Sequence, residues 1–459
     1  MAEQHAAPAL PLAPGIRVLV CGVGVAGTSA ARALLELGAV VTLTATRRSA
    51  GVDELERLGA HWADPLETVP DDIDFVVASP GVPPHDPLLR EADARPLPVF
   101  GEAELAWYLR PEQPAPWLAL TGTNGKTTTV HMLESILQAA GLRALAVGNV
   151  GTPLIDAVRE LPPYDVLAVE LSSQQLQFAP SVAPAAGALL NIAPDHLNWH
   201  GSMAAYERAK RHVLDADVAI VNADDPRVVE LAPDGAIGFT LGAPDDGQLG
   251  VVGGALVSRA FGDHDAVLAR VDDVRPAGAH NVANALAAAA LARAHGVAPA
   301  AIAAGLAAFT PDPHRNAFVA TVDGIDWVDD SKATNPHAAH ASLSAYPRIV
   351  WVAGGQLKGV DVADLVREAT PRLAGAVLLG ADRALVAAAL ARHAPDVPVI
   401  MVDSTDDGAM TEVVHAAAGL ARPGDTVLLA PAAASYDMFS GFGARGDAFA
   451  AAVHALADR

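Results

Sequence analysis

The chain has 459 residues, 51% of them hydrophobic and 18% charged, so it can form large buried cores and is too long for a single one. Its 53 acidic residues and 30 Lys and Arg give a net charge of −23, which excludes a general nucleic-acid binder because that function needs a broad basic face. The single cysteine, Cys21, excludes intramolecular disulfides and cysteine-based zinc sites and fits a reducing compartment. Residues 1–15 lack the basic start and apolar run of a signal peptide, and no apolar stretch is long enough to cross a membrane, so we expect a cytoplasmic protein.

Short β-rich segments alternate with Ala- and Leu-rich helical segments, which indicates βαβ units and mostly parallel sheets. The expected strands include 17–22, 117–122, 166–171, 348–355, 376–380, 397–403 and 425–431. They fall into three groups, separated by a Pro-rich linker at 111–116 and by the turn-rich segment 310–315. The segment 235–275 is rich in Gly, Asp and short β-like runs and is not clearly placed in any of these groups. The pattern predicts an α/β fold with three sheet systems.

The first expected strand runs into a loop with G-x-G-x-x-G spacing, Gly22 to Gly27, and a helical segment follows. Glycines at these positions permit a tight turn and let backbone N–H groups approach a phosphate. A nicotinamide site would need an acidic residue at the end of the second strand, where the sequence reads Thr44-Ala45-Thr46-Arg47-Arg48. These side chains favour a phosphate-bearing nucleotide instead, with Ser79-Pro80-Gly81 closing the same pocket. The alternative is that the glycines only allow close packing of strand and helix.

A second glycine loop, 121–128, lies between a strand and a helix and reads TGTNGKTT. Leu120 occupies the first glycine of the usual G-x-x-x-x-G-K-[ST] pattern, but the two glycines of the loop can still wrap phosphates. Lys126 can reach the terminal phosphates and Thr127 can bind Mg²⁺. The loop therefore predicts a nucleotide-phosphate site.

Several ionisable side chains follow this loop. Glu170 ends an apolar strand, Asp195 and His196 follow the expected apolar strand 188–192, and Lys210 lies on the next helix. Taken singly, Glu170 could be an exposed strand-end carboxylate, His196 a structural histidine and Lys210 a solvated helix lysine. Because parallel strands end at one edge of a sheet, we expect these residues to lie together beside the phosphate loop.

These segments together resemble the Mur ligase family of ATP-dependent amino-acid ligases, from about residue 16 to the C-terminus. The motifs that carry the resemblance are GTNGKT, ELSSQQL, NIAPDHLNWHG, NADDP, HNVANALAA, PHR, DDSKATNP, AGGQLKG and APAAASYDMFSGFGARG. DSKATN, the lysine soon after AGG and the late Ser-Tyr-Asp point to the member type that adds D-glutamate to UDP-N-acetylmuramoyl-L-alanine. The resemblance implies that ATP converts the substrate carboxylate to an acyl phosphate, as a step in peptidoglycan precursor synthesis.

The resemblance also implies three domains. A Rossmann-like domain at 1–112 would bind the UDP-linked substrate, and a central P-loop ATPase-like domain at 113–312, with a mostly parallel sheet, would bind ATP. A C-terminal Rossmann-like α/β domain at 313–459 would bind the amino acid and close on the nucleotide. The expected partners are these small-molecule substrates, with no nucleic acid and no membrane, and we expect a monomer.

Site residues follow from the same resemblance. ATP would contact Gly122, Thr123, Asn124, Gly125, Lys126, Thr127, Thr128, Asn281, Asn284, Arg315, Asp330 and Lys332. The UDP-linked substrate would contact Gly24, Val25, Ala26, Gly27, Thr46, Arg47, Gly81, Asn149 and Gln175. D-Glutamate would contact Thr334, Lys358, Ser435 and Phe442. A pair of Mg²⁺ ions would be held by Thr127, Glu170, His196 and Lys210. Lys126, His196 and Lys210 would be catalytic, and Lys210 matches the family lysine that reacts with CO₂ and carries a carbamate.

Some positions depart from the family pattern, and three alternatives stay open. The departures are Ala45, Gln174, Asp329 and Asn316-Ala317, of which Ala45 puts a uridine or ribose contact in doubt. The nearest alternative is a sister ligase that adds L-alanine or a diamino acid, or a folylpolyglutamate-synthase-like amide ligase. The second is an NAD(P)-dependent oxidoreductase, suggested only by the first glycine loop. The third is a nucleotide-gated binding protein, which has no reason to keep Glu170, His196 and Lys210 together.

Overall fold

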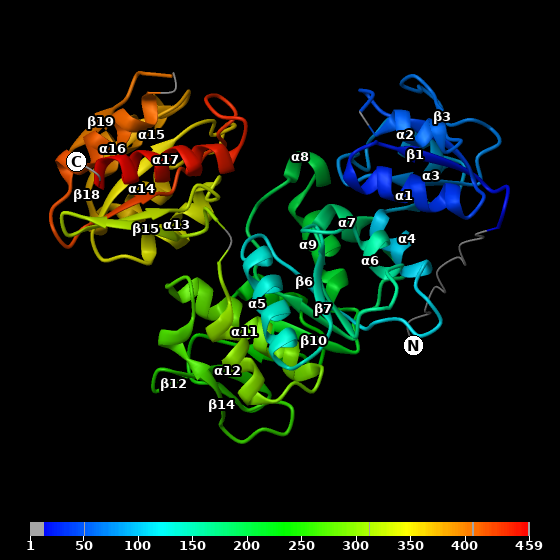
Figure 1. Ribbon diagram of the computed structural model, residues 1–459, viewed down its shortest axis with the longest axis horizontal. Helices are drawn as coiled ribbons and strands as arrows, with labels where there is room; N and C mark the ends of the chain where they lie inside the picture. The colour runs from blue at the N-terminus through cyan, green and yellow to red at the C-terminus, as the bar shows by residue number, and fades with distance from the viewer. Residues whose placement is uncertain (1–12, 50, 312, 406–407, 458–459) are drawn as a thin grey trace. The chain divides into compact units, whose positions relative to one another are not determined.

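The computed structural model describes residues 13–49, 51–311, 313–405 and 408–457 (Figure 1). The chain divides into two compact units, the first formed by Met1–Asp273 with Ala283–Phe309 and the second by Val274–Val282 with Thr310–Arg459. Most of the N-terminal segment in which no signal peptide is expected lies outside the described residues. The same holds for residue 312, the expected second domain boundary.

The first unit begins with a parallel sheet of order β3-β2-β1-β4-β5. Its strands are β1 (Arg17–Cys21), β2 (Val40–Thr44), β3 (His61–Trp62), β4 (Phe75–Ala78) and β5 (Val99–Phe100). The helices are α1 (Val25–Glu36), α2 (Val52–Arg57), α3 (Pro87–Ala94) and α4 (Glu102–Tyr108). Alternate residues of β1 enter different cores: Val18 and Val20 pack with α1, and Leu19 and Cys21 pack with α3. A strand that is buried on both faces reads as a continuous apolar run, which explains RVLVC.

The central sheet of the first unit has the order β14-β13-β12-β11-β10-β9-β6-β8-β7. Its strands are β6 (Trp117–Thr121), β7 (Ala144–Gly148), β8 (Val166–Glu170), β9 (Ala186–Leu189), β10 (Val218–Asn222), β11 (Ile237–Phe239), β12 (Gln248–Val252), β13 (Ala255–Ser258) and β14 (Ala266–Arg270). The helices are α5 (Lys126–Ala139), α6 (Leu154–Val158), α7 (Ser173–Gln177), α8 (Leu197–His200), α9 (Met203–Arg211), η1 (His212–Leu214), α10 (Pro226–Leu231), η2 (Val271–Asp273), α11 (Ala279–Ala294) and α12 (Pro299–Ala308). The segment that the sequence did not place supplies β11 to β14, and β12, β13 and β14 pair antiparallel at the sheet edge.

The second unit holds a sheet of order β15-β16-β20-β17-β18-β19. Its strands are β15 (Ala317–Val322), β16 (Ile325–Asp329), β17 (Ile349–Gly354), β18 (Leu373–Leu379), β19 (Val399–Met401) and β20 (Thr426–Leu429). The helices are α13 (Pro336–Ser344), α14 (Ala363–Ala369), η3 (Thr370–Arg372), α15 (Arg383–His393), α16 (Ala409–Leu420) and α17 (Phe442–Ala457). Only the β15–β16 pair is antiparallel among the described strands of this sheet. Two buried cores, one around Trp351 and the other around Trp327, cover its two faces.

The expected α/β fold with three mostly parallel sheet systems is confirmed. The seven expected strands coincide with β1, β6, β8, β17, β18, β19 and β20 to within a few residues. The expected strand 188–192 is wrong at its C-terminal end, because β9 ends at Leu189 and Asn191 and Ile192 belong to the loop that follows. No helix in the described part of the chain is both long and apolar enough to span a bilayer.

Candidate active site

The phosphate loop lies between β6 and α5, as expected. Gly125 has a φ of 82°, and a Cβ there would lie 2.3 Å from the Asn284 Oδ1 atom, so both the backbone conformation and the space favour glycine. The Lys126 ammonium donates to the carbonyl oxygens of Gly122 (2.9 Å) and Thr123 (3.0 Å). The 14-residue helix α5 begins directly after Gly125. The free N–H groups and the dipole at its N-terminus favour an anion.

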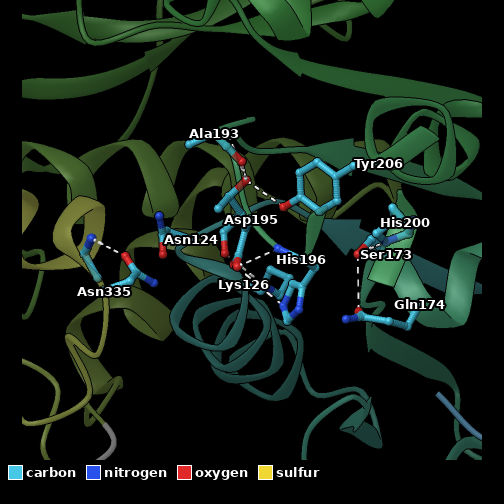
Figure 2. A network of polar contacts seen from close by, with 12 residues as sticks. Asn124, Lys126, Ser173, Gln174, Ala193, Asp195, His196, His200, Tyr206 and Asn335 are labelled. Carbon is cyan, nitrogen blue, oxygen red and sulfur yellow. Dashed lines mark hydrogen bonds and ion pairs between the residues drawn. The ribbon is translucent and has the colours of Figure 1, made fainter. Parts of the chain in front are cut away.

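Residues of the loop after β9 hold the phosphate loop in place. The Asn191 side chain accepts from the Asn124 backbone N–H (2.8 Å) and donates to the Asn124 carbonyl (3.0 Å). The Thr123 hydroxyl lies 3.1 Å from the Ala193 carbonyl and 2.9 Å from the Tyr206 hydroxyl, and it accepts from the Ala193 N–H (2.9 Å). Figure 2 shows Tyr206 and Ala193 close together at this position. Asn191 and Tyr206 are site residues that the sequence interpretation did not assign.

Lys210 lies in α9 and is buried, with only 2% of the residue exposed. Its ammonium nitrogen donates to the Gly122 carbonyl (2.7 Å) and lies 3.3 Å from the Thr121 hydroxyl. The nitrogen also lies 4.9 Å from the centre of the Tyr206 ring. The interpretation of Lys210 as a solvated helix lysine is therefore wrong.

Two lysine nitrogens, those of Lys210 and Lys126, converge on the same carbonyl oxygen of Gly122. Burial, and after it the neighbouring Lys126 charge, hold the pKa of Lys210 well below its ordinary value, although Asp195 and Glu170 act in the opposite direction. A lowered pKa increases the fraction of the neutral amine, which is the nucleophilic form.

Glu170 ends β8 and is buried, with 1% exposed, so the interpretation as an exposed strand-end carboxylate is also wrong. One oxygen, Oε1, accepts from the Asn149 side-chain amide at 2.8 Å. The other, Oε2, is buried and has no hydrogen-bond partner among the described residues. A buried carboxylate oxygen without a donor is costly, and a cation would satisfy it.

The strand order explains why these groups share one edge of the central sheet. β6 pairs in parallel with both β8 and β9, so the phosphate loop, Glu170 and the loop bearing Asp195 and His196 follow neighbouring strand ends. His196 precedes α8 with a φ of 50°, and its Nε2 lies 3.6 Å from Asp195 Oδ2 (Figure 2). Within the described ranges, no three His, Cys, Asp or Glu residues are grouped as a metal site. A metal here would need other ligands as well, such as a hydroxyl, a modified lysine or the substrate.

The first glycine loop borders a cavity of about 780 Å³. A Cβ at Gly27 would lie 2.0 Å from the Gly22 carbonyl oxygen, and one at Gly22 would lie 2.8 Å from Ser79 Cβ, so these two glycines do serve close packing. A Cβ at Gly24 would meet nothing within 4 Å, so its backbone is accessible. The cavity is lined by five of the residues expected to bind the UDP-linked substrate, namely Gly24, Val25, Ala26, Thr46 and Gly81. Of the other four, Arg47 is exposed, Gly27 is buried, and Asn149 and Gln175 line a separate cavity.

The residues expected to bind D-glutamate, with Asn281, Arg315, Asp330 and Lys332 of the expected ATP set, belong to the second unit. The Asp330 carboxylate accepts from the Asn316 N–H (3.2 Å) and from the Ser342 hydroxyl, and burial raises its pKa to about 6. The Lys332 nitrogen lies 3.9 Å from the centre of the Phe442 ring. Ser435 is buried, Thr334 is half-buried and Lys358 is exposed. Asn284, on the same helix as Asn281, belongs to the first unit.

Arg445 is a further residue that the sequence interpretation did not assign. It is 1% exposed and lies near the start of α17. Its guanidinium donates to the Ser331 hydroxyl (2.9 Å) and carbonyl (2.8 Å), to the Ala433 carbonyl (3.1 Å) and to the Gly354 carbonyl (3.4 Å). These acceptors lie at or beyond the ends of β16, β20 and β17, which are neighbours in the sheet. Arg445 therefore joins the loops that carry Lys332 and Ser435.

Three segments of the chain match known protein families. Residues 120–292 match the family described as Mur ligase middle domain, and residues 314–433 match the Mur ligase, glutamate ligase domain. Residues 3–79, which contain the first glycine loop, match the alanine dehydrogenase/PNT C-terminal domain.

Several relatives carry the name UDP-N-acetylmuramoylalanine–D-glutamate ligase, among them one from Streptomyces coelicolor and one from Thermobifida fusca. The one from Streptomyces coelicolor is 54% identical over 96% of this chain and 98% of its own length. The one from Thermobifida fusca is 56% identical over 96% of this chain and 99% of its own length.

Solved structures are similar in fold. UDP-N-acetylmuramate–alanine ligase from Thermotoga maritima has a TM-score of 0.59 at 17% identity, covering 96% of this chain and 99% of that chain. MurF from Acinetobacter baumannii has a TM-score of 0.59 at 18% identity, covering 98% of this chain and 92% of that chain. At these identities the similarity concerns the fold alone.

Proposed function

Since the chain belongs to the Mur ligase family, we propose that it is an ATP-dependent ligase that joins D-glutamate to UDP-N-acetylmuramoyl-L-alanine in peptidoglycan precursor synthesis. The sequence relatives that span nearly the whole chain support the choice of substrates. The observation that carries the chemistry is the convergence of Lys126 and Lys210 on Gly122, at a phosphate loop one strand away from the buried Glu170. A hydride-transfer enzyme would have no use for this arrangement.

The reaction has to turn a poor acyl donor into a good one. A carboxylate would have to expel oxide, whereas an acyl phosphate expels phosphate. ATP therefore transfers its terminal phosphoryl group to the alanyl carboxylate, the amine of D-glutamate attacks the acyl carbon, and the tetrahedral intermediate loses phosphate to give the amide. The enzyme contributes mainly positioning and charge neutralisation.

Positive charge matters because all the reacting groups are anions. Two unit charges 4 Å apart repel by about 4 kcal/mol at an effective dielectric constant near 20. In a chain of net charge −23, a few cations must supply the local compensation. We assign this task to Lys126 in the first unit and to Arg315 and Lys332 in the second.

The residues present fit a divalent cation. Glu170 Oε2 is a buried anionic oxygen with no donor among the described residues, and Mg²⁺ prefers oxygen ligands. We propose that Glu170, Thr127, His196 and a modified Lys210 would hold a pair of Mg²⁺ ions. When bound, the ions would neutralise the phosphate oxygens. Thr127 is half-buried at the start of α5, where its hydroxyl can take part.

We further propose that the Lys210 amine reacts with CO₂ to form a carbamate, which converts a buried cation into an anionic ligand. The neutral amine that this reaction needs is favoured by burial and by the charge of Lys126. A carbamate on Lys210 would be an anion close to two other acidic side chains, Glu170 and Asp195. A metal ion or the Lys126 ammonium beside it would have to balance this negative charge.

The remaining assignments are proposals of the same kind. Residues 1–112 would bind the UDP-linked substrate, residues 113–312 ATP, and residues 313–459 D-glutamate together with part of the nucleotide. The site residues would be those that the family resemblance assigns. We propose that the enzyme acts as a monomer in the cytoplasm, where ATP is available.

The choice of amino acid tests the function. With the UDP-N-acetylmuramoyl-L-alanine acceptor and ATP, D-glutamate should drive phosphate release, whereas L-lysine and diaminopimelate should not. Lys358 and Ser435 offer a cation and a hydroxyl, which suit a second carboxylate better than a second amine. Phosphate release is measured with each amino acid in turn, and a reaction without acceptor serves as the control. Equal turnover with L-alanine would show that the assignment to D-glutamate is wrong.

A further inference from the structure

A second cavity of the first unit, of about 290 Å³, is lined by residues from both of that unit's sheet systems. Val25 and Ala26 come from the first glycine loop, Asn149 follows β7, Gln175 lies in α7 and Glu102 begins α4. A few polar groups that converge on a largely apolar cavity are typical of a small-molecule site. Among the described residues that line this cavity, Glu102 is the ionisable one.

Glu102 is 2% exposed, and its carboxylate accepts hydrogen bonds from the backbone at the start of α6 and from a side-chain amide. Oε1 accepts from the Ile155 backbone N–H at 3.2 Å, and Oε2 accepts from the Gln175 side-chain nitrogen at 3.4 Å. The other end of the Gln175 amide is fixed as well, because its Oε1 accepts from the Ser172 backbone N–H at 2.9 Å. These two contacts determine which end of the amide is the donor. The amide nitrogen carries a second N–H, and this is the group that Gln175 can offer to a ligand in the cavity.

The other amide that lines the cavity is held in a similar way. The Asn149 side-chain nitrogen donates to Glu170 Oε1 at 2.8 Å. Both cavity amides are therefore oriented as donors by a buried glutamate. Glu170 has its own place in the proposed metal site. Glu102 has none, and its carboxylate joins the Gln175 amide to the backbone N–H groups at the start of α6.

We propose that Glu102 is a positioning residue whose ionised carboxylate holds the Gln175 amide as a donor to an uncharged oxygen of the UDP-linked substrate, so that affinity for this substrate falls when Glu102 is protonated. The ligand chemistry is that of a sugar hydroxyl, ether or amide oxygen, which accepts an N–H. The inference rests on the proposed function for the identity of the substrate.

Protonation of Glu102 falls in an accessible pH range. Burial raises its pKa to about 7, the bonds from Ile155 and Gln175 act in the opposite direction, and the charge of Asp156 raises it further. Asp156, in α6, accepts from the Ser29 hydroxyl at 2.8 Å. A hydrogen bond to a charged acceptor is roughly twice as strong as one to a neutral acceptor, so protonation weakens the hold on Gln175.

The other charged groups on the elements around Glu102 have partners elsewhere. On α1, which packs against α4 and α6, Arg32 pairs with Glu54 and Glu36 pairs with Arg159. On α4 itself, the Glu104 carboxylate accepts from the Ser181 backbone N–H at 2.9 and 3.2 Å. Glu104 is buried, its pKa is also raised by burial, and it does not line the cavity, so it is a matched control for Glu102.

The test compares Glu102→Gln, Glu102→Asp and Glu104→Gln with the wild-type protein between pH 6 and pH 8.5. The KM for the UDP-linked substrate and kcat are measured at saturating ATP and D-glutamate. Calorimetric titration with the UDP-linked substrate alone gives Kd over the same range. For a group with a pKa near 7, the ionised fraction falls by up to about tenfold between pH 8 and pH 6, which sets the largest change in KM.

In the wild-type protein, KM and Kd should rise several-fold as the pH falls from 8 to 6. In Glu102→Gln both should be high and independent of pH, while kcat stays within about twofold. Glu102→Asp should restore a pH-dependent KM, and Glu104→Gln should follow the wild type. A wild-type pH profile in Glu102→Gln, or its loss in Glu104→Gln, would overturn the inference. Absence of D-glutamate-dependent phosphate release by the wild-type protein would instead reject the proposed function. The calorimetric Kd is measured without D-glutamate, so it tests the role of Glu102 separately from the reaction.

Discussion

Replacing Lys210 with Met is expected to lower turnover by about a thousandfold, the scale of losing one preorganised electrostatic group. Met fills much of the volume of the buried lysine stem and removes the nitrogen that lies between Gly122 and Thr121. Ala would also leave a cavity, because only 2% of Lys210 is exposed, and large-to-small changes in a core cost about 2–5 kcal/mol. The measurement is phosphate release with all three substrates, together with a thermal unfolding curve. Arg208→Met, an exposed change in the same helix, is the control and should stay within about twofold.

The carbamate hypothesis makes further claims about the same position. Small carboxylates such as formate or acetate should restore part of the activity of Lys210→Ala by occupying the vacated anion position. Lys210→Arg should be inactive without rescue, because it keeps a positive charge and cannot react with CO₂. In ¹³C-bicarbonate, NMR of the wild-type protein should show a carbamate carbon that Lys210→Met lacks. Near wild-type turnover of Lys210→Met would mean that the proposed ligand set is wrong at this residue.

The local structure around the phosphate loop was predicted correctly. The phosphate loop and the strand before it depend on a short apolar run, two glycines and one helix start, all within about fifteen residues. The position of Glu170 at the end of a strand could be predicted from the same alternation of strands and helices. The shared edge of the sheet then follows from the rule for parallel strands, and the pairing of β6 with β8 and β9 agrees with it.

Burial of polar side chains could not be predicted in the same way. The helical spacing of Tyr206, Lys210 and Val213 does place the lysine on the apolar face of α9 and η1, a signal that the sequence contained. A lysine on such a face can nevertheless extend its long side chain and keep its ammonium group in water. The helical pattern alone therefore does not show whether the Lys210 nitrogen is buried. Glu102 is harder still, because its partners at Ile155 and Gln175 lie 53 and 73 residues away.

The edge of the central sheet was missed for a different reason. The strands β11 to β14 are three to five residues long and end in turns. The sequence there therefore lacks both the helical periodicity and the alternation of strands and helices that identified the other strands. β11 pairs in parallel with β10 and β12, and β12 to β14 form an antiparallel meander. Such a meander is specified by its turns and by pairing between neighbouring strands, and neither is visible in the composition. The sequence therefore did not place the segment 235–275, although its strands extend the central sheet.

Replacing Arg445 with Met should lower the free energy of unfolding of the second unit by about 3–5 kcal/mol, the cost of removing one partner from a buried charged network. The guanidinium is held by four hydrogen bonds, to Ser331, Gly354 and Ala433, so the change leaves three carbonyl oxygens and a hydroxyl without their donor. Burial lowers the pKa of Arg445 to about 10, opposed by Asp437 and Asp329, so the group remains charged at neutral pH. Lysine keeps the positive charge but lacks the planar guanidinium group with its several N–H donors. Arg445→Lys should therefore recover only part of the lost free energy of unfolding.

The consequence for function should be selective for the amino acid. Ser331 stands next to Asp330 and Lys332, and Ala433 lies two residues before Ser435, so loss of Arg445 loosens the loops that would bind D-glutamate. The KM for D-glutamate should rise at least about tenfold, while the affinity of the first unit for the UDP-linked substrate stays unchanged. Hydrogen exchange followed peptide by peptide locates the destabilisation, and Arg392→Met, the same change at an exposed position, is the control. Equal weakening of protection in both units, or an unchanged KM for D-glutamate, would contradict the role of Arg445 as the link between these loops.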